Sequence, residues 1–302
     1  MTGVRRVCCV ALNNLNPARV APRLAPPESR SNMKSIAVDR YTMRYVEMGT
    51  GQPLVAIHGS LGDFRTWSSV MGPLSRGRRL IVPSLRRFFP EHWDGTGGGF
   101  TIAQHTADVA AFIEGLQLGP VDLMGHSRGG HIAFRVAHQR PDLIRRLVLV
   151  EPGGELDASL MPQGEAAPTA RVDSIIEAAR LIEGGQVDIG LEGFVDRIYG
   201  KGVWARLPAT TKQPLRDNAF TLIGQIHEDR RPFGKADAEA IRSPTLLIGG
   251  GLTRGILASV LEILTATIPD ARLEIIPNTS HSMFDQAPVR FSEIVSHFLA
   301  GS

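Results

Sequence analysis

The chain has 302 residues, 43% of them hydrophobic and 21% charged, which is enough to bury one large core or two modest ones. The net charge is only +3 and the Lys and Arg residues are scattered, so the sequence argues against nucleic acid as a partner. No apolar run approaches the roughly 18 to 20 residues that cross a bilayer, and we expect a cytoplasmic protein with no membrane partner.

The first 32 residues differ in character from the rest of the chain. They hold four arginines and four prolines before Glu28, and no acidic residue precedes Glu28. We expect a disordered extension or an over-extended start, with Met33 as an alternative start. A signal peptide is the competing interpretation, but the apolar stretch Val7–Leu12 is shorter than such signals require. The only cysteines, Cys8 and Cys9, are adjacent and offer neither a disulfide framework nor a metal site.

The foldable part begins near residue 36 and alternates between strand and helix patterns. A hairpin is predicted over Ile36–Val38 and Tyr41–Glu47. Short continuous apolar runs, typical of buried parallel strands, follow at Leu54–Ile57, Leu80–Val82, Val121–Met124, Leu147–Val150, Thr245–Ile248 and Leu273–Ile276. Helical periodicity occurs at Thr66–Leu74, Ile102–Leu116, Gly129–Gln139, Ile256–Ile268 and Val289–Leu299. The alternation predicts an α/β fold with a mostly parallel, doubly wound sheet covered on both faces.

The alternation lapses between Pro152 and Ile241. Helical stretches occur there without a convincing strand, at Val172–Ile182, Leu191–Tyr199 and Leu215–Glu228. We therefore expect one α/β core, made of residues 33–151 and 241–302, with a helical cap inserted at residues 152–240.

One pentapeptide, Gly125-His126-Ser127-Arg128-Gly129, has the G-x-S-x-G pattern of a nucleophile elbow. The pattern alone is weak evidence, but here it directly follows a predicted strand and opens a predicted helix, as the elbow requires. A sharp turn would hold Ser127 exposed, while side chains at the two glycines would collide with backbone. The competing interpretation is a plain tight turn with a solvent-facing serine.

A serine hydroxyl needs a base within hydrogen-bonding reach. His281 follows the last predicted strand and precedes the final helix, which is where the base falls in the order nucleophile, acid, histidine. The oxyanion of acyl transfer needs two donors; we expect the backbone N–H groups of Arg128, at a helix start, and of Ser60, after His58-Gly59. The Arg128 side chain either lies on the surface or meets an anionic substrate.

On these motifs the chain resembles the α/β-hydrolase superfamily, in particular its capped esterase, lactonase and haloperoxidase-like members. The resemblance spans about residues 36–300 and is carried by His58-Gly59, the glycine-rich elbow at 125–130, the strand at 244–249 and Ser280-His281-Ser282. It implies the α/β-hydrolase fold and a Ser-His-acid triad without cofactor or metal.

The acid departs from the family pattern. Relatives carry an aspartate just after the strand at 245–248, but Gly249-Gly250-Gly251-Leu252-Thr253 has no acid and Thr253 stands in its place. Glu151 directly follows the strand at 147–150, where relatives such as haloalkane dehalogenases and zearalenone lactonases carry theirs. Strand ends converge in a doubly wound sheet, so Glu151 is predicted to meet His281. The alternatives are that Glu151 only caps a turn, or that Asp285 is the acid.

A second departure concerns the pocket. Where relatives show Asp-x-x-Gly-x-Gly, this chain has the basic and aromatic stretch 84–89, which we expect to narrow one pocket wall. Leu61, Trp67 and Trp204 are candidate lining residues, although core packing is the commoner explanation for isolated tryptophans. A short match around Trp204 to zearalenone lactonases makes a large lactone one option.

The leading hypothesis is hydrolysis of a carboxylic ester or lactone through an acyl-enzyme, with Ser127, His281 and Glu151 as the triad. The expected partner is the small-molecule substrate, and a homodimer is possible. Perhydrolysis, C–C bond hydrolysis and cyanohydrin lysis use the same groups and stay open. Dehalogenation and epoxide hydrolysis are disfavoured, since both need a carboxylate where Ser127 stands. A catalytically silent ligand-binding protein is the alternative outside enzymes.

Overall fold

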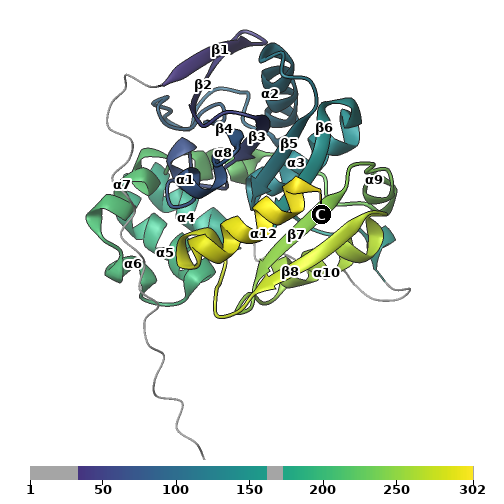
Figure 1. The fold of residues 1–302 in the computed structure, drawn as a ribbon. Coiled ribbons are helices and arrows are strands. Elements are labelled where there is room, and N and C mark those ends of the chain that lie inside the picture. Colours follow the sequence, from purple (N-terminus) through teal and green to yellow (C-terminus); the bar gives the residue numbers. More distant parts are fainter. Residues whose placement is uncertain (1–32, 162–172, 302) are drawn as a thin grey trace, which may run out of the picture.

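The protein is built on one eight-stranded sheet, seen in a computed structural model that describes residues 33–161 and 173–301 (Figure 1). The strands are β1 (Lys34–Val38), β2 (Tyr41–Met48), β3 (Gln52–Ile57), β4 (Arg78–Pro83), β5 (Val121–His126), β6 (Ile144–Val150), β7 (Thr245–Gly250) and β8 (Ala271–Ile276). Their order is β1-β2-β4-β3-β5-β6-β7-β8. The β1–β2 hairpin and the β2–β4 pair are antiparallel, and the other pairs are parallel. Every predicted strand is present. The predicted extension over residues 1–32 lies outside the described residues.

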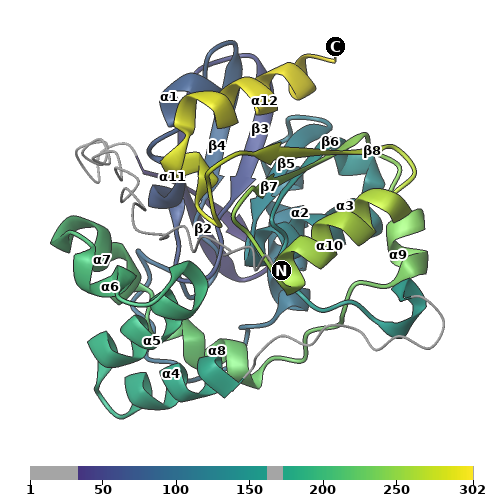
Figure 2. The same cartoon turned by 90° about the horizontal axis from the view of Figure 1, so that it is seen from below.

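Helices cover both faces of the sheet, as predicted (Figure 2). One face carries α2 (Ile102–Gly115), α3 (Arg128–Gln139) and α10 (Ile256–Thr267), and the other carries α1 (Met71–Leu74), α11 (Met283–Gln286) and α12 (Pro288–Ala300). Successive strand residues enter opposite cores: Leu147 and Leu149 of β6 join one, Val148 and Val150 the other. Burial on both faces explains why these strands are continuous apolar runs.

The helix predicted over Thr66–Leu74 is wrong. A 3-10 turn at Phe64–Trp67 is followed by the single helical turn of α1. The turn begins at Asp63, whose carboxylate accepts the backbone N–H of Arg65. Ser68 and Ser69 then separate the two turns, and Gly72-Pro73 disfavours extension of the second.

Of the six α-helices that the described residues form between β6 and β7, five make up one body at the side of the sheet (Figure 2): α4 (Asp173–Glu183), α5 (Val187–Tyr199), α6 (Val203–Arg206), α7 (Ala209–Asp217) and α8 (Thr221–His227). We refer to residues 173–228 as the helical insertion. Its apolar side chains form a cluster of their own, and Leu61 of the core joins that cluster. The helix predicted over Leu215–Glu228 is in fact α7 and α8, separated by a turn at residues 218–220.

The chain enters and leaves the insertion through two paired segments, which we call the neck. Asp157 N–H donates to Phe233 O at 2.9 Å, and Phe233 N–H donates to Glu155 O at 2.7 Å. A short helix, α9 (Lys235–Glu239), then leads to β7. Across residues 33–161 and 173–301, no helix is both long enough and apolar enough to span a membrane.

Candidate active site

Ser127 occupies a strained turn between β5 and α3. Its φ is 51°, in the region that side chains rarely adopt. From Val121 to Ala137 every residue is buried except Ser127. A Cβ on Gly125 would lie 2.2 Å from the carbonyl oxygen of Gly129, so only glycine fits there. The tight elbow therefore presents one side chain, the serine, at the carboxyl end of the sheet.

The Ser127 backbone is fixed by bonds to the neighbouring strand end. Its N–H donates to Val150 O at 3.0 Å, and its carbonyl accepts the N–H of Gly153 at 2.9 Å. A Cβ on Gly153 would come within 3.3 Å of the Ser127 hydroxyl oxygen. The segment after β6 therefore passes directly beside the candidate nucleophile.

Glu151 and His281 meet at the same edge. Glu151 is fully buried, and its Oε2 lies 2.6 Å from His281 Nδ1. Its Oε1 accepts the N–H of Gly250 at 2.7 Å and the hydroxyl of Thr253 at 2.5 Å. The carboxylate thus has partners on both oxygens, and its contact with His281 fixes the proton of that ring on Nδ1.

Thr253, the residue that the sequence analysis put in the place of the expected aspartate, donates its hydroxyl to Glu151, which directly follows β6. The sequence showed the missing aspartate but not this contact. Asp285, the weaker candidate for the acid, accepts instead from the hydroxyl of Ser69 at 2.8 Å. The structure therefore brings Glu151, and not Asp285, to the Nδ1 of His281.

Two buried histidines hold the loops of the site. His126 Nε2–H donates to the backbone oxygen of His281 at 2.9 Å, and burial lowers the pKa of His126 well below its usual value. His58 accepts the N–H of Leu85 on Nε2 at 3.1 Å and donates from Nδ1 to Gly59 O at 2.9 Å. Burial lowers the pKa of His58 to about 4, so the ring is neutral at pH 7.

The two residues expected to supply oxyanion donors lie on either side of the elbow. Gly59 packs closely on it, since a Cβ there would lie 3.1 Å from the Ser127 Cβ. Ser60 follows Gly59 in the turn after β3. Arg128 is the first residue of α3, where backbone N–H groups are not yet used by the helix. The Arg128 amide therefore directly follows the candidate nucleophile, and the Ser60 amide is one residue from the Gly59 contact with it.

The Arg128 side chain is neither on the surface nor open to a substrate, which corrects both expectations. It is buried, and its guanidinium donates to Glu228 at 2.5 and 2.7 Å in a bidentate pair. The same group donates to His105 Nδ1 at 3.1 Å. Burial opposes ionisation of Glu228, but Arg128 and Arg230 outweigh it and hold the Glu228 pKa below its usual value. The guanidinium of Arg128 is therefore paired with Glu228 of the protein itself.

Comparisons with known proteins identify the family of this fold. The sequence profile described as "Alpha/beta hydrolase family" matches residues 54–294. The chain belongs to the α/β-hydrolase family. This confirms the predicted fold and superfamily.

One sequence relative and two structures of similar fold illustrate the match. The 2-hydroxymuconate semialdehyde hydrolase of a Pseudomonas species is 28% identical over 84% of this chain and 89% of its own. A hydrolase from Pseudomonas aeruginosa has a TM-score of 0.74 at 20% identity, covering 91% of this chain and all of its own. The enol-lactonase of Burkholderia xenovorans reaches a TM-score of 0.71 at 19% identity, covering 88% of this chain and all of its own.

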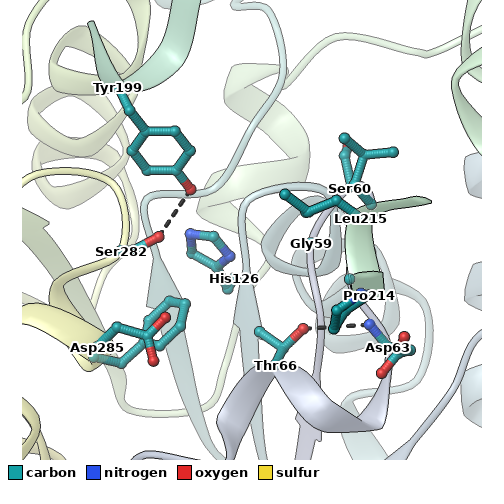
Figure 3. Close-up of a pocket in the computed structure, with 13 residues that line it drawn as sticks. Gly59, Ser60, Asp63, Thr66, His126, Tyr199, Pro214, Leu215, Ser282 and Asp285 are labelled. Atoms are coloured by element: carbon teal, nitrogen blue, oxygen red, sulfur yellow. Dashed lines mark hydrogen bonds between the residues drawn. The ribbon is translucent and has the colours of Figure 1, made fainter. Parts of the chain in front are cut away.

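A small cavity of this hydrolase lies between the core and the insertion (Figure 3). Its volume is about 70 Å³, and its lining includes Ser60 and His126 of the core, Tyr199 and Leu215 of the insertion, and Asp285. The hydroxyl of Tyr199 lies 2.8 Å from the Oγ of Ser282, the residue after His281 (Figure 3). Ser127 and His281 do not line this cavity, but the residues next to them in the chain, His126 and Ser282, do. Tyr199, which the sequence did not mark, therefore reaches from the insertion to the residue beside His281.

Of the three predicted pocket residues, only Leu61 lines the cavity. Trp67 is fully buried in the core under α12, with its ring 4.9 Å from that of Phe284. Trp204 is buried in the cluster of the insertion, where Lys212 Nζ lies 4.9 Å from its ring centroid. Both tryptophans fill cores, because each has apolar neighbours on several sides and no open space to face.

The basic and aromatic loop after β4 also differs from expectation, since residues 86–89 do not line the cavity. Arg86 pairs with Asp108 at 2.7 Å, and Phe88 is fully buried. Phe89 N–H donates to Asn218 Oδ1 at 2.7 Å, which ties this loop to the insertion. Within the described ranges, no group of three or more His, Cys, Asp or Glu side chains is arranged to hold a metal ion.

Proposed function

We propose that the protein is a serine hydrolase that cleaves a carboxylic ester or lactone through an acyl-enzyme. The observation that carries the proposal is the buried Glu151–His281 pair, at 2.6 Å. The strained, partly exposed Ser127 is tied to the same strand end, because its N–H donates to the carbonyl oxygen of Val150, the residue before Glu151. A serine without such a pair is a poor nucleophile near neutral pH.

The proposed reaction uses each group at a defined atom. Ser127 Oγ attacks the carbonyl carbon while His281 Nε2 takes its proton, and Glu151 stabilises the resulting imidazolium through Nδ1–H. The negative charge on the former carbonyl oxygen is met by the backbone N–H groups of Ser60 and Arg128. His281 then returns the proton to the departing alkoxide. A water molecule, activated by the same histidine, releases the acid and restores Ser127.

The cavity next to the elbow favours a short acyl group. It measures about 70 Å³ and is lined by both apolar and polar side chains, among them Leu215, Phe284 and Asp285. A dodecanoyl chain would not fit within this volume. We expect acetate and butyrate esters or small lactones to be preferred over dodecanoate esters.

The proposal is tested by labelling and turnover with the full chain. Wild-type protein should react with a fluorophosphonate probe at Ser127 and hydrolyse p-nitrophenyl acetate, and Ser127→Ala should do neither. Absence of labelling and turnover in the wild type would favour a silent binding protein. Two relatives covering about four fifths or more of this chain are named hydrolases of 2-hydroxymuconate semialdehyde and 2-hydroxy-6-oxo-2,4-heptadienoate. Ser127-dependent turnover of those compounds without ester turnover would replace the ester proposal.

A further inference from the structure

One helix of the insertion bonds to both residues that are proposed to supply oxyanion donors. Ser60 Oγ–H donates to Gln225 Oε1 at 2.8 Å, and Arg128 pairs with Glu228. Gln225 lies in α8, and Glu228 is the residue that ends it. Ser60 and Arg128 follow different strands of the core, but their partners are three residues apart and so share one face of the helix.

The Ser60 contact fixes a turn that carries backbone strain. The next residue, Leu61, has a φ of 57°, and its carbonyl accepts from Asn218 Nδ2 at 3.4 Å. Asn218 belongs to the turn that leads into α8. The Gln225 Nε2 atom is buried and has no hydrogen-bond partner in the described structure, so the polar contact of this amide is the one with Ser60. The insertion therefore holds the turn after β3 by two side chains.

The Arg128 contact is closed to solvent. The side chains of Arg128 and Glu228 are 0% and 1% exposed. The guanidinium also lies 4.5 Å from the Phe100 ring centroid. A bidentate pair in such surroundings has a defined geometry, and a buried pair that loses one partner leaves an uncompensated charge. Displacement of α8 would therefore disturb the first residue of α3.

We propose that α8 is a positioning element of the oxyanion hole, with Gln225 and Glu228 as positioning residues. This rests on the proposed function. Oxyanion donors act only when they are held at hydrogen-bonding distance from the developing charge. Since Ser60 lies in the turn after β3 and Arg128 in the first turn of α3, a rigid body bonded to both sets the spacing of their amides. The insertion would then contribute to the chemical step as well as to substrate binding.

The closest competing explanation is that these contacts only dock the insertion. The positioning proposal and the docking explanation predict changes in different kinetic constants. A loosened oxyanion hole lowers kcat, because it weakens an interaction made in the transition state, whereas a loosened pocket raises KM. Asp217 provides the matched control: it ties α7 to the core by an ion pair with Arg65 at 2.8 Å, without touching Ser60 or Arg128.

The test uses the full-length protein and p-nitrophenyl acetate. Gln225→Met keeps the length of the side chain but removes the acceptor, and should lower kcat by about tenfold with KM changed less than twofold. Gln225→Glu retains an acceptor for Ser60 and should restore most of kcat. Ser60→Ala combined with Gln225→Met should be no slower than either change alone, because one bond is removed in all three. Asp217→Asn should stay within twofold of wild type.

A second readout is affinity for a trifluoromethyl ketone, which forms a charged adduct on serine. Gln225→Met should weaken it by the same factor as kcat. Unchanged kcat, a change confined to KM, or an equal loss in Asp217→Asn would overturn the inference. If the wild type reacts with the fluorophosphonate and Gln225→Met reacts at the same rate, only this inference fails. A wild type without labelling or turnover would overturn the proposed function too.

Discussion

Replacement of Glu151 by glutamine is the most direct test of its proposed role as the acid of the triad. The amide has the same shape, and its oxygen can still accept from Gly250 and Thr253, so the fold should persist. Its NH₂ group would then face His281 Nδ1. That ring nitrogen would become an acceptor, and the proton would move to Nε2, the atom that must take the proton of Ser127.

The magnitude follows from the distance of the pair. The carboxylate oxygen lies 2.6 Å from Nδ1, which puts the two charge centres about 4 Å apart. At an effective dielectric constant near 20, a charge pair at that separation is worth about 4 kcal/mol. The imidazolium formed in the transition state loses that interaction, so kcat should fall by about 10³-fold.

The assay is kcat on p-nitrophenyl acetate between pH 6 and 9, with the fold checked by circular dichroism and thermal unfolding. Asp285→Asn is the control, since Asp285 bonds to Ser69. It should retain kcat within about twofold. A Glu151→Gln rate within tenfold of wild type would refute the reasoning, and a large loss in Asp285→Asn would move the role of the acid there.

Three further predictions concern the frame of the site. Thr253→Val removes the 2.5 Å hydrogen bond to Glu151 and should lower kcat about tenfold. Thr253→Ser retains the hydroxyl and should keep the kcat of wild type. Equal kcat values for the two variants would exclude a positioning role for Thr253. Gly125→Ala should lower the free energy of unfolding by several kcal/mol, because its Cβ would lie 2.2 Å from Gly129 O. Gly193→Ala is the control: this glycine is at an exposed position of α5 with nothing within 4 Å of an added Cβ, so the change should be neutral or stabilise by up to about 1 kcal/mol. Urea titration measures both. The pKa of His58 is 6.5 in the unfolded chain and about 4 in the folded protein. Below pH 6.5 the unfolded chain therefore binds a proton that the folded protein does not, and the free energy of unfolding should fall as the pH drops. From this ring alone the fall should be about 1.3 kcal/mol between pH 7.5 and 5.5. His58→Gln should remove that part of the slope, and an unchanged slope would contradict the assignment.

The parts of the site that a local pattern encodes could be predicted. Apolar runs marked the strands, and the glycines around Ser127 marked the turn, because close backbone contact excludes any side chain there. The position of Glu151 required more: its strand was clear from the sequence, but its pairing with His281 depends on which strand ends are neighbours in the sheet. Family resemblance supplied that information.

Contacts between distant, chemically ordinary residues could not be predicted. Arg128 and Glu228 are 100 residues apart, and most arginines and glutamates lie at the surface, so nothing in the sequence marked them as a buried pair. The link from Ser60 to Gln225 has the same character. Trp67 and Trp204 failed as pocket residues for the opposite reason, since a large ring predicts burial without indicating what surrounds it.

The paired segments of the neck have an evolutionary consequence. Because Glu155 and Asp157 bond to Phe233, the points where the chain leaves and rejoins the core are side by side. A segment whose two ends are adjacent can be shortened, lengthened or replaced with little cost to the core. Recombination at this neck would exchange the helical insertion while Ser127, His281 and Glu151 stay in place. If α8 positions the oxyanion donors, however, a transplanted insertion must bring its own equivalents of Gln225 and Glu228 to be active.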